Sequence, residues 1–108
     1  MTRTPTTRLA WVQEIRPGHV DDYARAHDDM WPDLLEAFQT AGIRNYSIFL
    51  HGKTAIGYLE SDDVERSLAW MAEQDVERRW VEAMDAHLDR GGPGGAVGPL
   101  REIWHLDR

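Results

Sequence analysis

The order of apolar strand-like segments and helical patterns constrains the fold of this chain more than any other feature. Runs rich in β-branched and aromatic residues predict strands, whereas apolar residues spaced three or four apart predict helices. The expected elements, in order, are a strand at Leu9–Ile15, a helical region at His19–Gln39, strands at Asn45–Leu50 and Thr54–Glu60, a helix starting near Asp62, a helix capped by Asp75, and a strand at Leu100–Leu106. This β-α-β-β-α-β order predicts an α+β fold of the split βαβ, ferredoxin-like kind.

Proline, glycine and capping residues predict where the helices begin and end. Pro32 removes one backbone donor, so it should kink or restart the first helical region near Trp31. Gly42 is suited to end that region in a left-handed conformation. Asp62 followed by Glu65 resembles a capping box, which predicts the start of the next helix.

Length and charge narrow the class of protein. A chain of 108 residues predicts one domain over residues 1–108, with the polar residues 1–7 flexible. The net charge of −7 argues against a nucleic-acid partner and fits a neutral ligand better than an anionic one. Without cysteine there can be no disulfide, thiolate metal site or cysteine nucleophile. Gly91–Gly98 has no preceding strand and no Lys-Ser/Thr, so it predicts a flexible connector rather than a phosphate loop.

The start of the chain and its hydropathy predict its location. Residues 1–7 hold no apolar signal-peptide core, and no apolar run approaches the length that spans a membrane. We therefore expect a cytoplasmic protein with no membrane contact.

The strands carry apolar or aromatic side chains on both faces of the expected sheet. Trp11 and Val12 point to opposite faces of the first strand, as do Tyr46 and Phe49 in the second. Helices from both crossovers would cover only one face, and a second face this apolar should also be covered. The simplest cover is the same face of a second copy, which predicts a homodimer formed sheet to sheet.

A cluster of side chains on the first helical region could carry chemistry. Tyr23, His27 and Trp31 are spaced four apart and would form a ladder on one face if the helix continued past Pro32. An imidazole can give and take protons near neutral pH, and flat aromatic faces suit the C–H-rich face of a sugar ring. The alternative is that His27 is a half-buried structural residue. Trp80 could likewise line a ligand site or belong to the core. No histidine pair has the spacing of metal ligands.

Four motifs in the same order resemble those of the L-rhamnose mutarotase family. The first follows a Y-x-x-x-H-x-x-x-W-P-E-L pattern, the second is a G-x-x-N-Y-S-I-x-L strand, the third a D-V-x-x-R-W-W-x-x-M helix and the last an L-x-E-V-F-H-L strand. The corresponding segments are Tyr23–Leu34, Gly42–Leu50, Asp75–Met84 and Leu100–Leu106. The similarity covers nearly the whole chain from about Arg8 onward.

The resemblance implies a dimeric α/β barrel that interconverts the α and β anomers of L-rhamnose without a metal or a cofactor. It implies that His27 is the general acid/base and that Tyr23, Tyr46, Trp80 and the neighbouring Val81 contact a small neutral sugar. Val81 stands where the family often has a second tryptophan, and the glycine-rich loop also departs from the family. Both departures concern the pocket wall, so L-fucose or another 6-deoxy sugar stays open as the substrate.

Two other functions remain open on the same architecture. One is a cofactor-independent monooxygenase or haem-degrading enzyme, which would need a large apolar cavity or an axial haem ligand. The other is a non-catalytic module that binds a small molecule. For the mutarotase itself, the base that opposes His27 is undetermined, and a water held by Tyr23 is one candidate.

Overall fold

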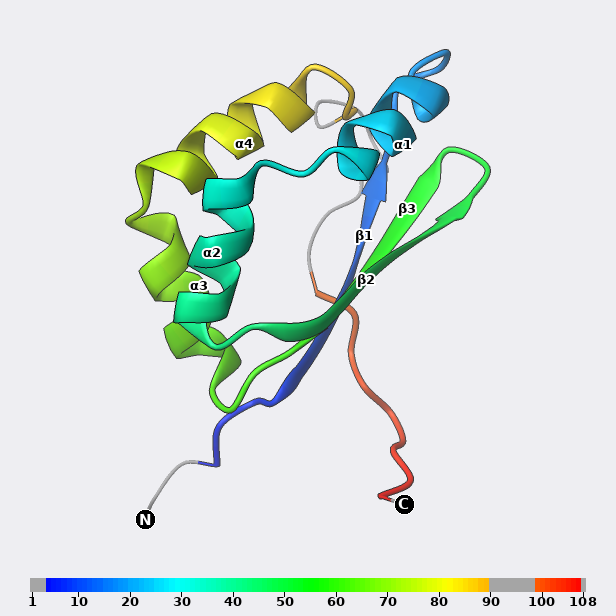
Figure 1. The fold of residues 1–108 in the computed structure, drawn as a ribbon. Helices are drawn as coiled ribbons and strands as arrows, with labels where there is room; N and C mark the ends of the chain where they lie inside the picture. Colours follow the sequence, from blue (N-terminus) through cyan, green and yellow to red (C-terminus); the bar gives the residue numbers. More distant parts are fainter. Residues whose placement is uncertain (1–3, 90–98, 108) are drawn as a thin grey trace.

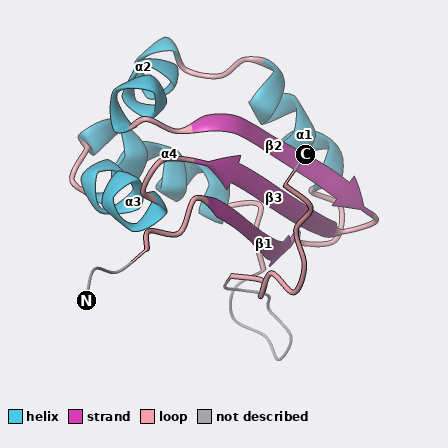
Figure 2. Ribbon diagram, turned by 90° about the horizontal axis from the view of Figure 1, so that it is seen from below, coloured by secondary structure: helices cyan, strands magenta, loops and turns pink. Residues whose placement is uncertain are grey.

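The computed structural model describes residues 4–89 and 99–107, and in this part of the chain helices cover one face of an antiparallel sheet (Figures 1 and 2). The strands, in spatial order, are β1 (Arg8–Glu14), β3 (Thr54–Glu60) and β2 (Arg44–His51). The helices are α1 (Val20–Asp28), α2 (Pro32–Ala41), α3 (Val64–Ala72) and α4 (Asp75–Asp85). The predicted α+β class and the predicted order of elements up to α4 are confirmed.

The first helical region is two helices rather than one. α1 ends at Asp28, and Pro32 is the first residue of α2, where a proline costs no helical hydrogen bond. Trp31 caps α2 with an extended backbone, at φ −64° and ψ 128°. The restart near Trp31 is therefore confirmed, but Trp31 does not share a helix with Tyr23. Gly42 ends α2 at φ 81°, as its predicted left-handed role requires.

Two helix starts differ from the prediction by one residue. Asp63, not Asp62, caps α3 by accepting a hydrogen bond of 3.2 Å from the backbone N–H of Arg66. Two consecutive aspartates offer the same capping chemistry, so local sequence could not choose between them. Asp75 is the first residue of α4 and Gln74 is its cap.

The sheet has one buried face and one open apolar face. Alternate residues of β3 are buried on the side that the helices cover, namely Ala55, Gly57 and Leu59. On the opposite face, Ile56 pairs with Val12 of β1 and with Phe49 of β2. Phe49 is 62% exposed. The prediction that both faces carry apolar side chains is confirmed.

The expected strand at Leu100–Leu106 does not form within the described chain, and this prediction is wrong for the single copy. A bridge at Pro99 and a hydrogen bond of 2.7 Å from the backbone N–H of Leu100 join the segment to β1. Beyond that point it runs on the side of the sheet away from α2, α3 and α4 (Figure 1). Its large apolar side chains are exposed: Ile103 by 81%, Trp104 by 75% and Leu106 by 65%. An alternating pattern predicts an extended segment but not which edge it pairs with.

Two expectations concern the ends of the described ranges. The connector at Gly91–Gly98 and residues 1–3 of the leading segment lie outside the described residues. The carbonyl groups of Thr6 and Thr7 accept backbone hydrogen bonds from Val64 and Ser61. The chain is therefore tied to the start of α3 before β1 begins.

Candidate active site

The main hollow of the described chain lies between the sheet and helices α1, α2 and α4. It consists of three adjoining cavities of about 310, 230 and 160 Å³, and Tyr46 and Trp80 line all three. The first two cavities have mostly apolar walls, whereas the third is more polar, and such a hollow is typical of sites for small molecules.

The hydrogen bond of His27 determines which of its nitrogens can exchange protons. Its Nδ1 atom lies 2.8 Å from the main-chain carbonyl oxygen of Tyr23, one turn earlier on α1. A carbonyl oxygen only accepts hydrogen bonds, so Nδ1 must carry the hydrogen. Nε2 is then the nitrogen whose protonation changes, and His27 lines two of the three cavities.

Aromatic rings hold His27 in place, although not in the ladder predicted from the sequence. The rings of Tyr23 and His27 are 4.7 Å apart between centroids. Trp80 of α4 contacts His27 edge to face, with 5.2 Å between the centroids and 89° between the planes. Trp31 meets the same indole at 5.2 Å and 87°. Trp80 therefore occupies the place beside His27 that the continuous helix would have assigned to Trp31.

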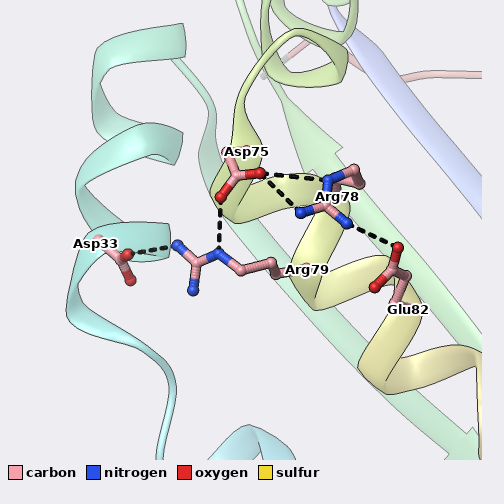
Figure 3. A network of polar contacts seen from close by, with 5 residues as sticks. All are labelled: Asp33, Asp75, Arg78, Arg79 and Glu82. Carbon is pink, nitrogen blue, oxygen red and sulfur yellow. Dashed lines mark hydrogen bonds and ion pairs between the residues drawn. The ribbon is translucent and has the colours of Figure 1, made fainter.

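An ion-pair network joins the beginnings of α2 and α4. Its members are Asp33, Asp75, Arg78, Arg79 and Glu82 (Figure 3). Arg79 bonds Asp33 at 3.1 Å and Asp75 at 3.0 Å, and its guanidinium lies 5.6 Å from the centre of the Trp31 ring. The two arginines hold the pKa of Asp75 below its usual value. Because the network is exposed, its ion pairs contribute little to the stability of the fold.

Tyr46 of β2 presents a hydroxyl group that stays protonated. Its ring meets Trp11 at 5.6 Å and Phe38 at 5.3 Å, both in edge-to-face contacts. Burial raises the pKa of Tyr46 strongly, and the charges of Tyr23 and Glu77 raise it further, although 38% of the residue is exposed. A phenol with a raised pKa donates a hydrogen bond at neutral pH and does not act as a base.

The five side chains that the family resemblance implied for the site line one cavity. Tyr23, His27, Tyr46, Trp80 and Val81 surround the space of about 160 Å³. Trp80 is only 8% exposed and also packs in the core, so it serves both as a wall and as a core residue. Val81, at 42% exposed, is the most exposed of the five.

The lining residues that the sequence reasoning missed include two that bear on the chemistry of the site. Trp11 and Glu77 each line two of the cavities. Trp11 was assigned only to the sheet. Glu77 is one of many acidic residues, and its position one turn before Trp80 was the signal available in the sequence. Among the described residues that line the three cavities, Glu77 is the only carboxylate. Burial raises its pKa.

The described residues hold neither a metal-binding cluster nor a membrane-spanning helix. Residues 4–89 and 99–107 contain no group of three or more His, Asp or Glu side chains arranged to hold a metal ion. In the same ranges, no helix has the length and apolar character needed to cross a membrane.

The family model and the relatives that match this chain carry the same description. The family model described as L-rhamnose mutarotase matches residues 8–106. The L-rhamnose mutarotase of Ligilactobacillus salivarius is 34% identical, covering 94% of this chain and 99% of its own. That of Burkholderia cenocepacia is 36% identical, covering 92% and 97%.

Two solved structures share the fold of the chain. A crystal structure of an L-rhamnose mutarotase from Formosa agariphila superimposes with a TM-score of 0.76 at 21% identity, covering 94% of this chain and all of that one, 100%. Tetracenomycin F2 cyclase from Streptomyces glaucescens superimposes with a TM-score of 0.66 at 16% identity, again covering 94% and 100%. At these identities the structural likeness shows the ferredoxin-like fold alone.

Proposed function

The chain belongs to the L-rhamnose mutarotase family, and we propose that it interconverts the α and β anomers of L-rhamnose in the hollow around His27. The family's reaction makes the chain an isomerase that acts on a sugar. One observation carries the assignment of the site: the acid/base histidine and the four side chains expected to contact the sugar line a single cavity.

Mutarotation opens the sugar ring to its aldehyde and closes it on the other face of the carbonyl. Opening requires a proton at the ring oxygen and the removal of a proton from the anomeric hydroxyl. His27 supplies the first proton from Nε2 and recovers it on closure, because Nδ1 is held by the Tyr23 carbonyl. A positioned acid or base of this kind contributes about 10²- to 10⁴-fold to a rate.

The aromatic residues bind the sugar rather than move its protons. The indole of Trp80 offers an apolar surface to the C–H groups of the ring, and the hydroxyl group of Tyr46 donates a hydrogen bond. Tyr23 lies 4% exposed behind His27 and fixes its ring. Val81 is smaller than a tryptophan and leaves more space on its side of the cavity.

Anomer exchange measured by NMR tests this function directly. Saturation transfer between the α and β anomeric protons of L-rhamnose should show exchange well above the background in water. A panel containing L-fucose and other 6-deoxy sugars would determine the preferred substrate. No acceleration on any anomeric sugar by a folded protein would remove the proposal and would favour a non-catalytic binding module.

We also propose a homodimer formed through the open face of the sheet. Val12, Ile56 and Phe49 form an apolar row on this face, and the exposed apolar tail of residues 99–107 lies on the same side. A second copy would cover the row and give the tail an edge to pair with. Sedimentation at micromolar concentration should show twice the chain mass, and a stable, well-folded monomer would overturn the proposal. The cytoplasmic location stays a prediction.

The rival reactions on this architecture are less well supported. The relatives matched over the length of the chain are mutarotases, whereas the cyclase is similar in fold only. A protein without visible absorption and without oxygen uptake would agree with the mutarotase assignment.

A further inference from the structure

We propose that Glu77 is the second acid/base group of the site, the one that removes the proton from the anomeric hydroxyl while His27 protonates the ring oxygen. This inference rests on the proposed function and deepens it, because the mechanism proposed above has an acid, His27, but no opposing base. Four observations about the place and surroundings of Glu77 carry it.

The first observation is the position of Glu77 relative to His27. Glu77 lies in the first turn of α4, three residues before Trp80, whose ring touches His27. Residues three apart on a helix lie on the same side, so the carboxylate and the indole face the same space. His27 and Glu77 come from different helices and line the same cavity of about 160 Å³. They therefore have access to one bound molecule from two directions.

The second observation is that Glu77 lacks a protein partner. In residues 4–89 and 99–107, no hydrogen bond or ion pair is formed by its carboxylate. The neighbouring acids of α4 behave differently, since Asp75 binds Arg78 and Arg79, and Glu82 binds Arg78. Of these three acids of α4, Asp75 and Glu82 form ion pairs at its surface, whereas Glu77 faces the hollow.

The third observation is that the other ionisable groups of the hollow cannot serve as the base. Tyr46 keeps its proton, because burial and the nearby charge of Glu77 raise its pKa. Tyr23 contributes its carbonyl oxygen to His27 and its ring to the packing. Among the described lining residues, only the Glu77 carboxylate remains to accept a proton opposite His27.

The fourth observation is that the surroundings of Glu77 adapt it to proton transfer. Its partial burial disfavours the charged form and raises its pKa. A carboxylate with a raised pKa is a stronger base than an exposed one, and proton transfer is most efficient when the pKa lies nearer the working pH.

The reaction balances with these two groups alone. His27 gives its Nε2 proton to the ring oxygen, the bond from that oxygen to the anomeric carbon breaks, and Glu77 takes the hydroxyl proton as the aldehyde forms. The aldehyde turns about the bond to the next carbon, and the former ring oxygen attacks the other face. Glu77 then returns its proton to the anomeric oxygen, and His27 recovers its own from the attacking oxygen.

The test compares Glu77→Gln with a matched change on the same helix. Glu82→Gln removes an exposed carboxylate of α4 that does not line the three cavities. Anomer exchange of L-rhamnose should fall at least about a hundredfold in Glu77→Gln and stay close to wild type in Glu82→Gln. Glu77→Asp, which keeps a shorter carboxylate, should retain an intermediate rate.

The pH profile separates a base from a structural residue. The wild-type rate should fall on the acidic side as Glu77 gains a proton, and this fall should be absent from the residual rate of Glu77→Gln. Thermal melting of each variant shows whether the fold is retained. Wild-type exchange in folded Glu77→Gln, or a lost rate that only follows lost folded protein, would overturn the inference. If the wild type itself does not accelerate exchange, the proposed function fails instead, so the two failures are distinguishable.

Discussion

The indole of Trp80 contacts the imidazole of His27 edge to face, with planes inclined at 89° and centroids 5.2 Å apart. His27 is thereby held from two sides, by this indole and by the carbonyl oxygen of Tyr23. The contact joins a residue of α1 to a residue of α4, which makes the site a product of packing between helices. The following predictions test it.

Replacing Trp80 with phenylalanine should weaken sugar binding while the protein stays folded. The smaller ring keeps an apolar wall but loses contact with His27 or Trp31. The substitution should cost less stability than the truncation of a buried tryptophan to alanine, which typically costs about 3–5 kcal/mol. Titration with L-rhamnose measures the affinity. Trp70→Phe on α3, outside the three cavities, is the control. A Trp80→Phe protein that melts readily but keeps its affinity would make Trp80 a core residue only.

Changing His27 to asparagine should lower the exchange rate at least about a hundredfold and leave the quaternary structure unchanged. Asparagine keeps polarity and much of the volume, but it cannot be protonated at neutral pH. The change therefore tests proton transfer rather than packing. Saturation-transfer NMR reads the rate, and thermal melting recorded alongside excludes unfolding as the cause. Wild-type-like exchange in folded His27→Asn would remove His27 from the mechanism.

Gly57→Ala should disturb the site through Trp11. A Cβ atom at residue 57 would overlap the ring of Trp11, which lies opposite this glycine on the neighbouring strand. The ring must move, and overpacking of this kind costs about 1–3 kcal/mol. Because Trp11 lines two cavities, sugar affinity should fall as well. Denaturant unfolding checks the stability.

The cause of that loss can be tested with a second substitution. In a Trp11→Ala background the alanine at 57 meets no indole, so its additional cost should nearly disappear. An undiminished cost would mean that Gly57 is required for its backbone rather than for Trp11.

Glu77→Gln should stabilise the protein at neutral pH. Burial raises the pKa of Glu77 in the folded state, so the folded protein binds this proton more tightly than the unfolded chain does. The wild type therefore loses stability as the pH rises from the ordinary glutamate pKa, about 4.3, through the higher folded value. Glutamine has no such proton, so the variant should match the wild type below that range and exceed it above. Melting temperatures of both proteins between about pH 4 and 8 check this difference in stability. A variant that is less stable than the wild type at neutral pH would contradict the prediction.

Local sequence patterns predicted the order of the elements up to α4 and part of the lining of the cavity. Apolar periodicity predicted every strand and helix up to α4, because it reflects the burial of one face and needs no distant partner. The spacing of Tyr23 and His27 placed their rings together, since residues four apart on a helix are neighbours. The motifs identified five of the residues that line one cavity.

The remaining features depend on contacts between distant segments, which form only in the tertiary structure. The break before Pro32 moved Trp31 to α2, and the packing of α4 then brought Trp80 to His27 instead. Packing also turned Glu77 toward the hollow while its acidic neighbours stayed at the surface. The pattern at Leu100–Leu106 predicts an extended segment but carries no information about which edge completes it. Local patterns record which face of an element is buried, whereas the partner on that face is selected by the packing of the whole molecule.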